Sequence, residues 1–168
     1  MRYTFAAAAL SLIAVVTAST GQSAPPQPLD PRASALAVAG RAALAANDPD
    51  SAVADFEAAL TIQPGTVAIY LDLADATRRQ GLQGKALRYY RAALAVDPAN
   101  LVAISGEGVT LVEKGAVGKA QRNLARLQSL CGNSCEPARA LAAAIARGPA
   151  PQVVSAADVT PKPVASEN

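Results

Sequence analysis

The sequence predicts an all-α protein, a right-handed α-solenoid of three helix-turn-helix repeats closed by a C-terminal capping helix. Hydrophobic residues make up 51% of the 168-residue chain, yet it has no Trp, two Phe and four Tyr. Ala and other small aliphatic residues must therefore supply the apolar surface, and Ala is the strongest helix former. The alternation of apolar and polar residues that is typical of β-strands is scarce. A third observation, a period of 34 residues, indicates stacked repeats.

The period is carried by small residues and by the large residues that follow them. Ala52, Ala86 and Ala120 are 34 residues apart. Six positions keep this register through three copies, which is hard to obtain by chance even in an Ala-rich chain. The other five sets are Gly40, Ala74 and Gly108; Asn47, Gly81 and Gly115; Phe56, Tyr90 and Leu124; Ala59, Ala93 and Leu127; and Pro64, Pro98 and Gly132.

Each unit has the features of two antiparallel helices joined by a short turn. A small residue where two helices cross removes side-chain bulk, and one large apolar residue fills the space beside it. Asn47, like the glycines at its position in later copies, suits the left-handed conformation that ends many helices. Asp48-Pro49 and Asp97-Pro98 each predict an N-cap followed by proline at the first helical position.

From about Ala33 to Gly132 these residues resemble the tetratricopeptide repeat family, in which each unit is a pair of antiparallel helices. The resemblance implies repeats at about 33–66, 67–100 and 101–134. The third unit departs from the family pattern, because it lacks the closing proline and has Glu107 where the family has an apolar residue.

A final helix is expected over residues 136–147. Leu141, Ala142 and Ile145 have helical spacing, and a solenoid needs its last hydrophobic face covered. The whole repeat domain is therefore expected to span residues 33–147.

Residues 1–18 are expected to form a signal peptide. Arg2 is followed by an apolar run over Phe5–Val16, and Val16-Thr17-Ala18 places small residues at the positions a signal peptidase reads. A buried helix or an uncleaved anchor is the alternative, but the run is shorter than the roughly 20 residues that a span needs. We expect a periplasmic or secreted protein with no stable membrane span after cleavage.

Two segments outside the repeats are expected to be flexible. A leader over residues 19–32 is rich in Ser, Thr, Gly, Gln and Pro, and residues 148–168 form a proline-rich tail. Neither segment has enough apolar surface to offset the entropy lost on ordering.

Cys131 and Cys135 are the only cysteines, and an even pair in an exported protein predicts a disulfide bond. The alternative is a thiol pair for redox exchange or metal handling. Copper sites of that type generally add His or Met ligands, but the chain has no His and its only Met is Met1. We expect no metal and no cofactor.

Catalysis and nucleic-acid binding are both disfavoured. A chain without His cannot form the usual hydrolase triad, and no glycine-rich phosphate loop is complete. Asp72 and Asp75 are interpreted as part of a solvated helix face. The net charge is only +2, and Arg78-Arg79 is the only adjacent basic pair, so no basic stripe for nucleic acid exists.

The resemblance implies a binding surface on the concave side, lined by the first helix of each repeat. Carried over position by position, the partner-binding residues are Arg41, Leu71, Asp75, Arg78, Val109 and Val112. A protein or extended peptide with apolar side chains and an acidic group would suit this surface. The expected function is an exported, non-catalytic scaffold in cell-envelope assembly or secretion. The alternative is a thiol-redox or metal-handling module that uses Cys131 and Cys135.

Overall fold

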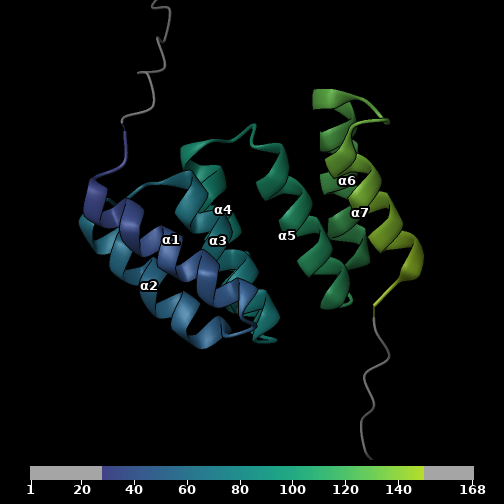
Figure 1. Cartoon of the computed structure of the whole chain (residues 1–168). Helices are drawn as coiled ribbons and strands as arrows, with labels where there is room; N and C mark the ends of the chain where they lie inside the picture. Colours follow the sequence, from purple (N-terminus) through teal and green to yellow (C-terminus); the bar gives the residue numbers. More distant parts are fainter. Residues whose placement is uncertain (1–27, 150–168) are drawn as a thin grey trace, which may run out of the picture.

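The computed structural model describes residues 28–149, which contain seven α-helices and no strand (Figure 1). The expected signal peptide and the tail from residue 150 onward lie outside the described residues. The helices are α1 (Pro31–Ala45), α2 (Pro49–Ile62), α3 (Val67–Arg79), α4 (Gln83–Val96), α5 (Leu101–Glu113), α6 (Val117–Cys131) and α7 (Glu136–Arg147). Within residues 28–149, no helix is both long enough and apolar enough to cross a membrane.

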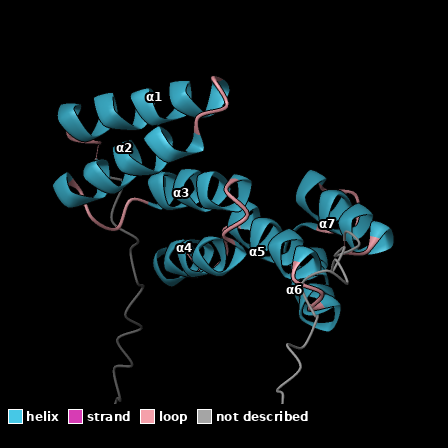
Figure 2. Ribbon diagram, turned by 90° about the horizontal axis from the view of Figure 1, so that it is seen from below, coloured by secondary structure: helices cyan, strands magenta, loops and turns pink. Residues whose placement is uncertain are grey.

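The helices pack as three successive pairs and a cap, which confirms the all-α repeat fold. α1 packs on α2, α3 on α4 and α5 on α6, while α2 with α3 and α4 with α5 join neighbouring pairs. α7 contacts both helices of the last pair. Figure 2 shows this series from α1 and α2 at one end to α6 and α7 at the other.

Small residues at the predicted positions allow the helices of each pair to approach closely. Ala52, Ala86 and Ala120 are all fully buried. A Cβ atom added to Gly40 would lie 2.6 Å from Cε1 of Phe56, so this ring occupies the space that the missing side chain leaves. The register predicted from the 34-residue period is therefore the register of the packed core.

The first helix begins earlier than the sequence suggests, which shortens the leader expected over residues 19–32. Pro31 is its first residue, and the Asp30 carboxylate accepts a hydrogen bond of 2.8 Å from the Arg32 backbone N–H. Hydrogen bonds from Arg32 also lower the pKa of Asp30. Leu29 packs against the core of the first pair, so the ordered chain starts before the cap.

The predicted cap at Asp97-Pro98 is wrong, although the equivalent cap at Asp48 is present. The Asp48 side chain accepts from the Ser51 N–H at 3.1 Å. Asp97 instead ends α4, because its backbone N–H donates to the Ala93 carbonyl. α5 starts three residues later, after Asn100, whose side chain accepts from the Ala103 N–H at 2.9 Å.

The capping helix covers the last pair through two of the three residues expected and two further alanines. Leu141 is fully buried and Ile145 partly buried, but Ala142 is exposed, and Ala138 and Ala144 complete the buried side. A Cβ atom added to Gly108 of α5 would lie 2.5 Å from Leu141 Cδ2. Leu141 thus fills the space that this glycine leaves open.

Candidate functional site

The first helices of the three pairs form one continuous surface, because α3 contacts both α1 and α5. We call this surface, formed by α1, α3 and α5, the first-helix face. It carries the residues that the sequence selects for partner binding. Its charged side chains are arranged as ion pairs that connect one repeat to the next.

The first of these ion pairs joins α1 to α3. Arg41 Nε lies 2.9 Å from the Asp72 Oδ2 atom. Burial raises the pKa of the Asp72 carboxyl, and the nearby Arg41 opposes this effect only in part. The guanidinium of Arg41 therefore already has an anionic partner within the protein.

A second group of charges joins α3 to α5. Arg78 contacts Asp75 at 2.8 Å on its own helix and Glu113 at 2.9 Å on α5. Asp75 also contacts Arg79 at 2.8 Å. Burial alone would lower the pKa of Arg78, but the hydrogen bonds to Asp75 and Glu113 outweigh it and raise the pKa. We call the six ion-paired residues of the first-helix face the charge ladder: Arg41, Asp72, Asp75, Arg78, Arg79 and Glu113.

The charge ladder has no net charge, because its three cations match three carboxylates: Arg41, Arg78, Arg79, Asp72, Asp75 and Glu113. The expected recognition of an acidic ligand by Arg41 and Arg78 would require these pairs to break. The polar groups of the first-helix face instead hold neighbouring repeats together.

Arg78→Gln is expected to lower the free energy of unfolding by about 1–3 kcal/mol, because half-buried Glu113 and Asp75 lose a charged donor. Urea denaturation of the purified protein measures this loss of stability. The loss should be smaller in 1 M NaCl, because salt screens the ion pairs. Arg122→Gln is the control, since Arg122 is exposed on α6. Equal stability of the two variants would show that the charge ladder does not join the repeats.

The three apolar residues predicted for the site differ in their solvent exposure. Leu71 and Val109 are half-buried, and Leu71 packs against the cluster of Ala74, Ala86 and Tyr90. Val112 is only 3% exposed, so its side chain adds almost no surface to the first-helix face. It lies in the core cluster that includes Leu141 of the capping helix.

A small pocket opens between α5 and α7, and it contains none of the six predicted residues. Its volume is about 230 Å³. Ser105 closes one side by donating a hydrogen bond of 3.0 Å to the Pro137 carbonyl. We call it the α5–α7 pocket; its lining is Tyr90, Val102, Ser105, Gly106, Glu136, Pro137 and Ala140.

Gly106 is the residue that makes this pocket possible. A side chain at this position would collide with the ring of Tyr90, which comes from α4 and reaches the pocket beside the bare glycine backbone. Burial raises the pKa of Tyr90, so its phenol stays a neutral hydrogen-bonding group. Val102, which lines the pocket, is 58% exposed.

The ion pairs between first helices were not predicted, but the repeat period contains a signal for them. The ladder partners Arg41 and Asp72 are 31 residues apart, and Arg78 and Glu113 are 35 apart. Opposite charges separated by nearly one period are placed on neighbouring first helices. A glycine inside a helix, as at Gly106, is likewise a signal of close packing.

No cluster of three or more His, Cys, Asp or Glu side chains able to hold a metal occurs within residues 28–149. Cys131 and Cys135 lie at the turn between α6 and α7, with their sulfur atoms at disulfide-bonding distance and their Cα atoms 5.9 Å apart. That position connects the capping helix to the last pair.

Comparison with known proteins identifies the repeat. A family model for the tetratricopeptide repeat matches residues 33–66 and 67–100, the first two helix pairs. No curated protein sequence matches the chain at a significant level.

Several solved structures share the fold. The tetratricopeptide repeat domain of Sgt2 from Aspergillus fumigatus has a TM-score of 0.64 at 22% identity, over 86% of this chain and 94% of that chain. The corresponding domain of Arabidopsis OM64 has a TM-score of 0.63 at 16% identity, over 69% and 95%. The first such domain of Spaghetti, solved with the HSP90 peptide SRMEEVD, has a TM-score of 0.60 at 19% identity, over 68% and 94%.

Proposed function

Because the chain belongs to the tetratricopeptide repeat family, we propose that it is an exported, non-catalytic scaffold that binds an extended segment of a partner protein on its first-helix face. A fold neighbour, the Spaghetti domain, was solved with a bound peptide, which supports peptide binding as a use of this fold. Envelope assembly or secretion is the setting we propose, on the basis of the predicted signal peptide.

The observation that carries the proposal is the α5–α7 pocket beside a charge ladder that is already paired. A ligand gains little from charges that are satisfied within the protein, because each existing ion pair must first be broken. An exposed valine and a small pocket favour an apolar side chain instead. The proposed ligand is therefore an extended peptide whose anchor is one small aliphatic residue.

Val102→Asp is expected to reduce partner capture at least tenfold, because a carboxylate at the pocket opening would have to be desolvated without a partner. Val102 is 58% exposed, so the fold should be unaffected. The control is Leu130→Asp on α6, at 47% exposure and outside both the pocket and the first-helix face. The measurement is affinity capture from the producing cell, followed by mass spectrometry. Equal capture by both variants would exclude the pocket as the binding site.

The proposed export leads to two further expectations, and both can be tested on a single preparation of the protein. Protein purified from its producing cell should begin near Ser19 and should show no free thiol before reduction, because an oxidising compartment joins the cysteine pair. Intact-mass measurement with and without a thiol-alkylating reagent gives both results. An intact Met1 together with two reactive thiols would contradict export and support an intracellular protein.

A further inference from the structure

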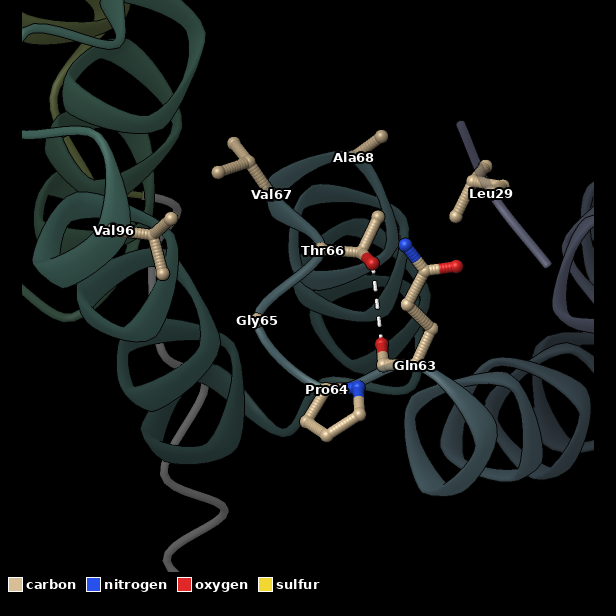
Figure 3. Close-up of a pocket in the computed structure, with 8 residues that line it drawn as sticks. All are labelled: Leu29, Gln63, Pro64, Gly65, Thr66, Val67, Ala68 and Val96. Carbon is tan, nitrogen blue, oxygen red and sulfur yellow. Dashed lines mark hydrogen bonds between the residues drawn. The ribbon is translucent and has the colours of Figure 1, made fainter. Parts of the chain in front are cut away.

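A second pocket lies at the edge of the solenoid, where α1 begins, α2 turns into α3 and α4 ends (Figure 3). Its volume is about 540 Å³, more than twice that of the α5–α7 pocket. We call it the edge pocket. Leu29 and Val96 lie on opposite sides of it, with the segment from Gln63 to Ala68 between them. It shares no lining residue with the α5–α7 pocket.

The lining of the edge pocket is uncharged and mostly apolar. No Asp, Glu, Lys or Arg contributes to it, and the Val96 side chain at its border is 52% exposed. A half-exposed valine next to a cavity of this size is apolar surface that is still open to water. Covering it with an apolar group would be favourable.

Gln63 supplies an oriented hydrogen-bond donor at this place. Its Oε1 atom accepts the backbone N–H of Asp30 at 2.6 Å, which identifies the other terminal atom as the amide nitrogen. That nitrogen has no hydrogen-bond partner among residues 28–149. Figure 3 shows it on the side of the amide that faces Thr66. The pocket therefore offers an N–H group that an acceptor could bind.

We propose that the edge pocket binds the proline-rich segment that directly precedes Leu29, Ala24-Pro25-Pro26-Gln27-Pro28. The chain enters the described structure at Pro28, and the next residue already lines the pocket. Five residues in the polyproline II conformation extend over about 15 Å. This inference is independent of partner binding on the first-helix face.

The chemistry of the segment matches the chemistry of the pocket. Residues 19–28 contain no charged side chain, like the lining of the pocket. Proline has a carbonyl acceptor but no backbone N–H, so a proline-rich strand presents what the Gln63 amide nitrogen lacks. Polyproline II is also largely preformed in such sequences, which lowers the entropy lost on docking.

The test is an NMR measurement of backbone order on the isotope-labelled purified protein. The amides of Ala24 and Gln27 should have order parameters near the rigid value of about 0.85. Val96→Asp should bring them below about 0.6, whereas Val38→Asp, at a valine that is 59% exposed against 52% for Val96, should leave them unchanged. Pro25→Gly combined with Pro26→Gly, which alters only the leader, should also bring them below that value.

Three results would overturn the proposal. Order parameters below about 0.6 in the unmodified protein would show that the segment does not dock. Nuclear Overhauser contacts from the Val96 methyl groups to residues 150–168, and not to Pro25 or Pro26, would assign the pocket to the other proline-rich segment. Order that rises with protein concentration would assign it to a second copy of the chain. None of these results depends on capture of a partner by the first-helix face.

Discussion

Phe56→Ala is expected to lower the free energy of unfolding by about 3–5 kcal/mol, because it removes the largest fully buried side chain of the first helix pair. Denaturation in urea, followed by circular dichroism, measures the loss. The ring lies beside Gly40 of α1, so the substitution leaves a cavity between α1 and α2.

The partner substitution Gly40→Ala should have opposite effects in two backgrounds. In the unmodified protein it should destabilise by about 1–3 kcal/mol, because the new Cβ would lie 2.6 Å from the Phe56 ring. In the Phe56→Ala background the clash is absent and alanine is the better helix former, so Gly40→Ala should stabilise by up to about 1 kcal/mol. Additive effects in the double variant would show that the two positions do not form the crossing.

Leu141→Ala is expected to cost about 2–5 kcal/mol and to loosen α7, because Leu141 is fully buried and fills the space beside Gly108. Urea denaturation gives the total loss, and hydrogen exchange of the α7 amides locates it. Arg139→Ala on the exposed side of the same helix should change stability by less than about 0.5 kcal/mol. If the two variants are equally stable, α7 does not cap the solenoid through this side chain.

The repeat register could be predicted from sequence because packing requires the same residue size at the same place in each unit. Ala52, Ala86 and Ala120 are all fully buried, and only a small residue fits there. The cap at Asp97 could not be predicted in this way. Asp97 and Asn100 both have side chains suited to capping, and the choice between them depends on where the α4 hydrogen bonds end.

The exposure of site residues was harder to predict, because it depends on side-chain length as well as repeat position. Arg78 and Val112 are one period apart and occupy equivalent places on α3 and α5. The long side chain of Arg78 reaches Glu113 on the next first helix. Val112 is too short to extend past its neighbours and is buried with the capping-helix residues.

Pocket formation depends on contacts between segments that no local pattern reports. The α5–α7 pocket needs Tyr90 from α4, the bare backbone of Gly106 and the start of α7 at the same place. Gly106 can be recognised in the sequence as a glycine inside a predicted helix. The sequence does not show that the Tyr90 ring from α4 packs beside it. The six predicted residues lie on α1, α3 and α5, and none of them lines this pocket, to which α4, α5 and α7 contribute.

The most direct test of the binding proposal is site-specific photo-crosslinking in the producing cell. A photoreactive amino acid would replace Val102 at the α5–α7 pocket in one variant and Leu130 on α6 in another, positions that are 58% and 47% exposed. The proposal predicts a covalent adduct to a partner protein from position 102 and none from position 130. An adduct from position 130 alone, or equal adducts from both, would contradict binding on the first-helix face.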